Sequence, residues 1–148
     1  MAIYLDDLNK DIKAWFAFKP AGDPEETDEA NLADDQFAVE IRLLTAGERD
    51  QVTSKEFYTE FEGDVAKGQL EQKMKIDRLG AREMLTQMAV SGWRGIYEDR
   101  KKQKPLPCTQ SNKRRLLNRL PGFGAFVSSA HGILLERAEA EREELEKN

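Results

Sequence analysis

The segment 37–44 restricts the possible folds of this chain more than any other part of the sequence. Apolar side chains occupy every second position in it: Phe37, Val39, Ile41 and Leu43. Such alternation predicts a β-strand with one buried side and one solvent-facing side. A second alternating run, residues 13–19, ends at Pro20 and predicts an antiparallel partner strand. Because two strands alone are marginal in water, we expect helices to cover their apolar face.

The residues between the two expected strands are strongly acidic. Segment 21–36 has no Lys or Arg, and its acidic residues are Asp23, Glu25, Glu26, Asp28, Glu29, Asp34 and Asp35. This composition predicts a solvated, mobile connection between the strands of a hairpin. The alternative is an acidic segment that attracts a basic partner.

Helix signals begin directly after the second strand. Thr45 and Glu48 have the spacing of a capping box, and residues 53–56 repeat it. The region is therefore expected to form one interrupted helix or two short ones. Phe57 and Phe61 would share one face of such a helix.

From about residue 64 to residue 90 we expect mainly helix. Apolar residues recur there at helical spacing: Leu70, Met74, Ala81, Leu85 and Met88. Gly80 is a candidate break or kink. The methionines suit core packing, or alternatively an adaptable binding surface. Segment 91–97, which contains Gly92, Trp93 and Gly95, is expected to end this helix.

The last third of the chain predicts an extended piece followed by two helices. Pro105 and Pro107 keep the chain extended. Thr109 is a good N-cap for a short helix that Pro121 and its following glycine would end. A final helix is expected to begin near Phe123; it is amphipathic at first and nearly all charged from residue 136 onward.

Together these patterns predict a mainly α-helical α+β fold, in which a small antiparallel β-hairpin packs against about four helices. A length of 148 residues suits a single domain spanning residues 1–148. The acidic 21–36 loop and the charged helix end, residues 136–148, are expected to be its most mobile parts.

The supply of reactive side chains is small. The chain holds one cysteine, Cys108, and one histidine, His131, so a site with several Cys or His ligands cannot form. Cys108 lies in an expected loop and His131 in an expected helix, which disfavours a nucleophilic pair. Neither a phosphate loop nor a dinucleotide-binding fingerprint occurs. We therefore expect no enzymatic activity, no cofactor and no metal.

The sequence also predicts a cytoplasmic location. An acidic pair follows Leu5 where a signal peptide would carry positive charge, and no run of roughly 20 apolar residues could span a membrane. A single cysteine agrees with a reducing compartment.

The second half contains an ordered series of spaced residues: Gly92-Trp93-Arg94-Gly95-Ile96, Leu106-Pro107-Cys108-Thr109, Asn112, Leu116-Leu117 and Pro121. An aromatic helix and a charged tail follow. This order resembles the pattern of tail assembly chaperones from long-tailed bacteriophages (siphophages) or prophages. Segment 37–48 also resembles the strand that leads into a helix in their first half. The turn at 98–103 and Cys108 depart from the pattern, which usually has an Asp/Gly turn and an aromatic residue there.

The resemblance implies a chaperone that is absent from the finished virion. Such a protein coats the aggregation-prone tape measure protein in the host cytoplasm until tail tube subunits polymerise around it. The implied partners are the tape measure protein and the tail tube protein. The residues that carry the resemblance are Trp93, Gly95, Leu106, Pro107, Asn112 and Leu116.

The start of the last helix is a second candidate for partner binding. Its apolar residues could form core or a client-binding groove: Phe123, Phe126, Val127, Ala130 and Leu134. Trp93 could likewise be a core anchor or a binding hot spot. No membrane contact is expected.

The stretch 100–119 suggests two further alternatives. It carries eight basic residues and no acidic one, so it could contact nucleic acid. The net charge of −5 speaks against that function. Acidic segments 23–35 and 136–146 are simpler partners for it, within one chain or between copies in a homo-oligomer. Another phage morphogenesis or connector protein is the remaining alternative.

Overall fold

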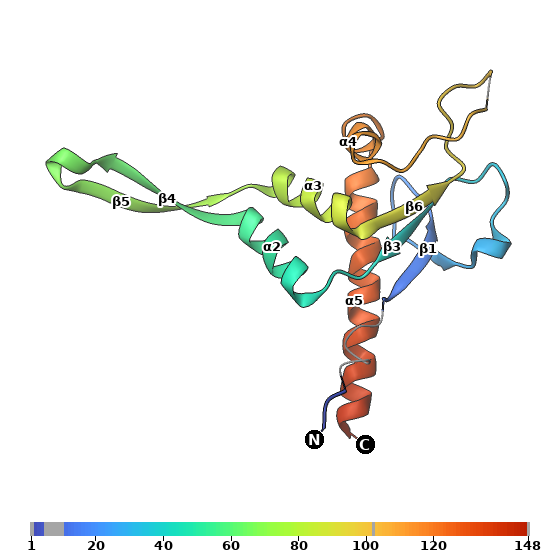
Figure 1. Ribbon diagram of the computed structural model, residues 1–148, viewed down its shortest axis with the longest axis horizontal. Helices are drawn as coiled ribbons and strands as arrows, with labels where there is room; N and C mark the ends of the chain where they lie inside the picture. Colours follow the sequence, from blue (N-terminus) through green and yellow to red (C-terminus); the bar gives the residue numbers. More distant parts are fainter. Residues whose placement is uncertain (1, 5–10, 102, 148) are drawn as a thin grey trace.

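Residues far apart in the sequence form one four-stranded antiparallel sheet. The computed structural model describes residues 2–4, 11–101 and 103–147 (Figure 1). The strands lie in the order β2-β1-β3-β6. Their bounds are Lys13–Ala17 for β1, Glu26–Thr27 for β2, Ala38–Arg42 for β3 and Val90–Arg94 for β6.

The predicted hairpin of β1 and β3 is confirmed. Phe16 lies opposite Val39 and Ala14 lies opposite Ile41 in an antiparallel register. Phe16, Val39 and Ile41 are fully buried, so the alternation in both strands directs one apolar side into the core. The acidic connection between them contributes the short β2 and a 3-10 turn, Glu29–Asn31.

Four α-helices complete the α+β fold, which confirms the predicted class. They are α2 Ala46–Glu56, α3 Arg78–Ala89, α4 Gln110–Arg119 and α5 Phe123–Lys147. The long α5 runs across β1 and β3 and continues beyond the sheet (Figure 1). Thr109 caps α4 by accepting a hydrogen bond from the Asn112 amide, as predicted. Asp77 caps α3 by accepting a hydrogen bond from the Gly80 amide. Gly80 therefore lies in the first turn of α3 and does not break this helix.

The expected helix from residue 64 to residue 76 is wrong, and so is a helical Phe57–Phe61 face. Residues 57–76 form two antiparallel strands, β4 Phe57–Asp64 and β5 Gln69–Ile76, joined by a 3-10 turn at Val65–Lys67. A spacing of four residues fits one face of a helix and also one side of a strand, since four is a multiple of two. Gly68 follows the turn with a φ of 66°, a conformation that favours glycine.

Segment 91–97 also differs from its prediction. Residues 90–94 do not simply end the preceding helix but form β6, which pairs with β3 at the edge of the sheet. Trp93 lies opposite Val39, and the strand places it against the core. The strand is short and contains Gly92, so it carries a weak sequence signal.

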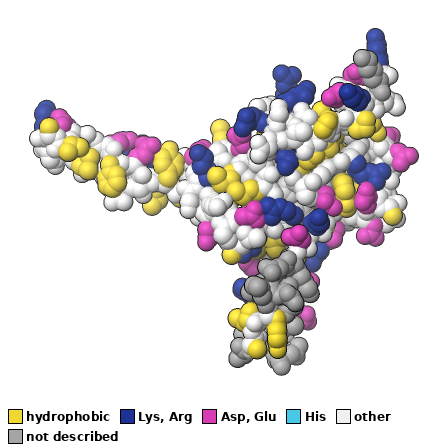
Figure 2. Space-filling view, viewed as in Figure 1, with side chains coloured by type: hydrophobic (Ala, Val, Ile, Leu, Met, Phe, Trp, Pro, Cys, Tyr) yellow, Lys and Arg dark blue, Asp and Glu magenta, His cyan; other side chains and the backbone are white. Residues whose placement is uncertain are grey.

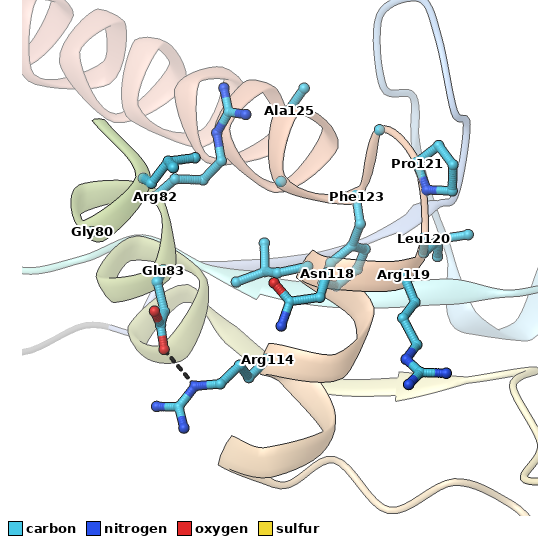
Figure 3. A pocket seen from close by; sticks show the side chains of 14 residues that line it. Gly80, Arg82, Glu83, Arg114, Asn118, Arg119, Leu120, Pro121, Phe123 and Ala125 are labelled. Atoms are coloured by element: carbon cyan, nitrogen blue, oxygen red, sulfur yellow. Dashed lines mark hydrogen bonds and ion pairs between the residues drawn. The ribbon is translucent and has the colours of Figure 1, made fainter. Parts of the chain in front are cut away.

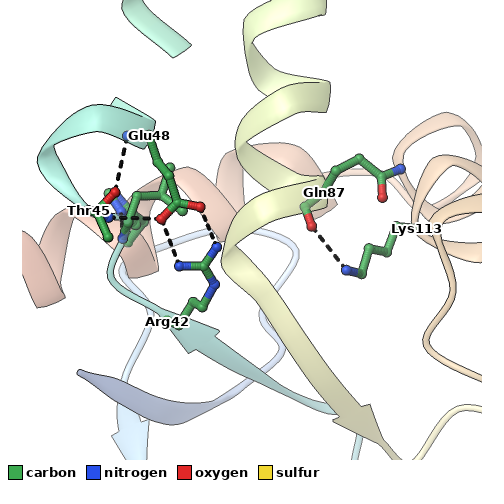
Figure 4. Close-up of polar contacts among 7 residues, drawn as sticks. Arg42, Thr45, Glu48, Gln87 and Lys113 are labelled. Atoms are coloured by element: carbon green, nitrogen blue, oxygen red, sulfur yellow. Dashed lines mark hydrogen bonds and ion pairs between the residues drawn. The ribbon is translucent and has the colours of Figure 1, made fainter. Parts of the chain in front are cut away.

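The junction of β3 and α2 confirms the capping box at Thr45 and Glu48. The Thr45 side chain accepts a hydrogen bond from the Glu48 amide, and the Glu48 carboxylate accepts one from the Thr45 amide (Figure 4). Arg42 on β3 donates two hydrogen bonds to the same carboxylate, at 2.6 and 2.9 Å. The bond from Arg42, followed by the bond from the Thr45 backbone, lowers the pKa of Glu48 to about 2.

We expect Glu48→Gln to lower the free energy of unfolding by about 1 kcal/mol at pH 7, because the variant loses the charge-assisted contact with Arg42. The folded-state pKa of Glu48 lies below its ordinary value of 4.5, so the stabilisation is complete above pH 4.5 and is lost as the pH falls towards 2. Urea denaturation of both proteins between pH 7 and pH 3 measures this. A difference that stays constant over that range would contradict the assignment.

Candidate functional site

The strands β4 and β5 form an arm, residues 57–76, that projects away from the body of the protein (Figure 1). It joins the body where α2 ends and α3 begins, and the Asp77 amide donates a hydrogen bond to the Glu56 carbonyl there, at 2.7 Å. Two-stranded ribbons are marginal in water when nothing covers them. The arm is therefore the part of the fold that most requires a functional explanation.

One side of this arm, here called the apolar face, carries no charge. Facing residues of an antiparallel pair point to the same side, and four such pairs make up this face: Phe57 with Ile76, Thr59 with Met74, Phe61 with Gln72, and Gly63 with Leu70. Phe61 is 64% exposed and Met74 is 76% exposed. Figure 2 shows apolar side chains gathered along the arm. Contiguous exposed apolar surface of this kind typically marks an interaction site.

The opposite side of the arm, the charged face, consists of the alternate pairs: Tyr58 with Lys75, Glu60 with Lys73, Glu62 with Glu71, and Asp64 with Gln69. Glu62 lies 2.8 Å from Lys75 and 3.0 Å from Lys73, and hydrogen bonds from these two lysines lower its pKa. These contacts are solvated and add little stability. Their effect is to leave one side of the arm hydrated and the other side apolar.

The residues that carry the family resemblance meet in one structural unit beside β6. The Trp93 indole N–H donates to the Leu106 carbonyl at 2.7 Å, and the Asn112 side-chain amide donates to the Pro107 carbonyl at 2.8 Å. The Leu106 amide in turn donates to Ile96 at 3.0 Å. These bonds hold the extended piece before α4 against the sheet, and Leu116 packs into the core. The unit stabilises the fold, as the core-anchor interpretation of Trp93 proposed.

Gly95 belongs to the same unit for a backbone reason. Its φ is 78°, and a Cβ atom there would lie 2.0 Å from the Gln36 carbonyl oxygen. Only glycine allows the chain to turn at this point while passing so close to the acidic connection. Gly95 is therefore a structural residue and offers no side chain to a partner.

The candidate groove on α5 is wrong as an exposed surface, because its residues are buried. Phe123, Val127, Ala130 and Leu134 are fully buried, and Phe126 is 3% exposed. Phe126 and Phe123 pack against Phe18 at ring distances of 5.2 and 6.4 Å. An amphipathic pattern indicates that one face of a helix is buried but not what buries it. For α5, the four-stranded sheet buries that face.

Comparison with protein-family models, with curated proteins and with solved structures finds no match to this chain.

The acidic segment pairs with basic residues outside the 100–119 stretch. Arg94 on β6 lies 3.6 Å from Glu29 and 3.8 Å from Asp34, and Arg137 on α5 pairs with Glu26. We expected the basic stretch 100–119 to be a partner of this segment within the chain, but these contacts involve Arg94 and Arg137 instead. They fasten the connection between β1 and β3 to the edge of the sheet and to α5.

The basic stretch itself is partly engaged within the protein. Arg114 lies 2.7 Å from Glu83, and Lys113 donates to the Gln87 carbonyl at 3.1 Å (Figures 3 and 4). Arg114 and Arg119 also line a cleft of about 380 Å³ between α3, α4 and the start of α5 (Figure 3). Two of the eight basic residues of the stretch, Lys113 and Arg114, therefore join α4 to α3 and are less available to a nucleic-acid backbone.

Cys108 and His131 lie in different environments. Cys108 is half-buried just before α4, and burial raises the pKa of its thiol. His131 is buried within α5, where its Nε2 atom accepts a hydrogen bond from the Leu44 amide at 3.1 Å. A thiol with a raised pKa is a poor nucleophile, and this histidine nitrogen is already occupied. In the part of the chain that the structure describes, no group of three His, Cys, Asp or Glu side chains could hold a metal, and no helix is long and apolar enough to cross a membrane.

His131 should make the stability depend on pH. Burial, and then the charges of Arg49 and Arg42, lower its pKa below the ordinary value of 6.5. The unfolded chain therefore binds a proton more readily, so we expect full stability above pH 6.5 and a loss as the pH falls below it. Since it is the only histidine, an NMR titration assigns its pKa without ambiguity. A measured pKa above 6.5 would contradict a buried His131 whose Nε2 atom accepts a hydrogen bond from the Leu44 amide.

Proposed function

We propose that this protein is a tail assembly chaperone of a long-tailed bacteriophage or prophage. It binds the tape measure protein, keeps it soluble in the host cytoplasm and promotes assembly of the tail tube, without remaining in the virion. The observation that carries the proposal is the apolar face of the arm, which has exposed aromatic and aliphatic side chains and no charge. The spaced residues of segments 37–48 and 92–121, which resemble that family, supply the identity of the client.

The geometry of the arm suits reversible binding of an apolar polypeptide. The apolar face can cover exposed apolar side chains of the client, while the charged face remains in water and keeps the complex soluble. The outer edges of β4 and β5 also carry backbone groups outside the ladder that joins these two strands, which an extended client segment could pair with. The arm continues directly from the end of α2 into the start of α3, and the hydrogen bond from the Asp77 amide to the Glu56 carbonyl closes its base.

Co-expression tests this proposal directly. The tape measure protein of a long-tailed phage is expressed alone and together with this protein, and the soluble tape measure protein is measured in both cases. We expect soluble client only in the presence of the chaperone. An unchanged insoluble pellet at equal expression levels would overturn the proposal.

A further inference from the structure

We infer that a second copy of this chain covers the apolar face of the arm when no client is bound, in a dimer whose two arms lie antiparallel and face to face. The dimer itself follows from the arm geometry alone. Its role, which is to hide the client-binding surface until the client arrives, rests on the proposed function.

The pattern of side-chain sizes along β4 carries this inference. On the apolar face, large and small residues alternate in the order Phe57, Thr59, Phe61, Gly63. When a second β4 lies over the first in the opposite direction, Phe57 meets Gly63 and Phe61 meets Thr59. Each large ring then faces a small residue, as close packing between two sheets requires. If the arms were parallel, a two-fold axis along the arm would place β4 over β5, so that Phe57 would meet Ile76 and Phe61 would meet Gln72, large residue against large.

On the second strand, the same arrangement brings together side chains that carry no charge. An antiparallel overlay of β5 on β5 places Leu70 over Ile76 and Gln72 over Met74. No charged side chain lies on this face, so the pairing desolvates no ion. One two-fold axis relates both overlays, so the arrangement closes at two copies and does not extend into a fibre.

The buried area predicts a weak dimer. The exposed parts of the five large apolar residues sum to roughly 500 Å² per arm, and hence about 1,000 Å² for two arms, at the lower end of specific interfaces. An interface of this size can be displaced by a client with a longer apolar surface. A permanent dimer would prevent client binding, whereas a fully exposed arm would favour aggregation.

Sedimentation of the full chain in the absence of any client tests the dimer. We expect a monomer–dimer equilibrium that shifts towards the dimer in sodium sulfate, because this salt strengthens apolar association and screens charge. Phe61→Ser should remove the dimer, and Tyr58→Ser, the matched change on the charged face, should retain it. A monomer at every concentration would overturn the inference. A dimer that dissociates in salt and tolerates Phe61→Ser would also overturn it, because association would then depend on the charged segments.

Cross-linking tests the antiparallel direction. In a Cys108→Ser background, Thr59→Cys places two thiols near the two-fold axis, within reach of a bismaleimide that spans roughly 10–15 Å across packed sheets. Lys67→Cys places them at opposite ends of the dimer, roughly 40 Å apart. Cross-linking of the first variant and not the second is expected, and equal cross-linking of both would overturn the arrangement. Because no client takes part, failure of the dimer and failure of the chaperone proposal are separate results.

Discussion

Phe123→Ala is expected to lower the free energy of unfolding by about 3–5 kcal/mol, the range for removing a buried aromatic side chain. Phe123 is fully buried at the start of α5, and its ring lies 6.3 Å from Phe37 and 6.4 Å from Phe18. The substitution leaves a cavity where α5 meets the sheet. A domain of this size has a total stability of about 5–15 kcal/mol, so the loss is a large share of it.

Urea denaturation followed by tryptophan fluorescence measures this loss. Phe61→Ala is the matched control, since it removes the same ring from the exposed arm, and it should cost less than about 1 kcal/mol. If Phe123→Ala lowered the free energy of unfolding no more than the control does, the start of α5 would have to be an exposed surface. That result would favour the client-binding groove on α5 over the buried core.

Replacement of both Phe61 and Met74 by serine is expected to abolish client binding and to leave the fold intact. These side chains project from the centre of the apolar face and contribute little to the stability of the body. Each supplies about 1.5–3 kcal/mol if a client buries it, so the double variant should bind roughly a hundredfold to ten-thousandfold more weakly. Co-expressed tape measure protein should then return to the pellet.

The matched control changes Tyr58 and Lys73 to serine, on the same two strands but on the charged face. Both double variants should unfold at urea concentrations close to that of the original protein. Retention of soluble client by the apolar-face variant, or an equal loss in the control, would contradict a specific role for the apolar face.

The elements with a local chemical signal could be predicted from the sequence. Alternation at 37–44 and 13–19 predicted the β1–β3 pair because a half-buried strand needs a side-chain period of two. Thr45, Thr109 and the proline-glycine pair at 121–122 predicted helix ends because they satisfy or interrupt backbone hydrogen bonds. These signals depend on a few neighbouring residues and little on tertiary context.

The arm could not be predicted because its apolar residues fit two structures equally well. Phe57 and Phe61, like Leu70 and Met74, are four residues apart and share a side in a helix and in a strand. The position of Phe61 between Glu60 and Glu62, and the glycines near the turn, were the available signals for strands. As a helix, the methionine stripe suited core packing first and a binding surface only as the alternative, so the exposed arm was not predicted.

The residues of the motif were found by sequence reasoning, and the core-anchor interpretation of Trp93 agrees with the structure. Trp93, Asn112 and Leu116 are joined through hydrogen bonds and packing that fix the segment before α4. A spaced motif shows that residues depend on one another, and such dependence arises in a fold as readily as in a binding site. The surface with the greatest exposed apolar character lies in segment 57–76, which carries none of the motif.

Site-specific photo-cross-linking tests the central claim most directly. A photoreactive phenylalanine analogue at position 61 is compared with the same analogue at position 58, on the opposite side of the arm, in cells that also produce the tape measure protein. We predict that position 61 captures the tape measure protein and that position 58 does not. Capture at equal levels from both positions, or none from position 61 while the client remains soluble, would contradict the claim that the apolar face of the arm binds the client.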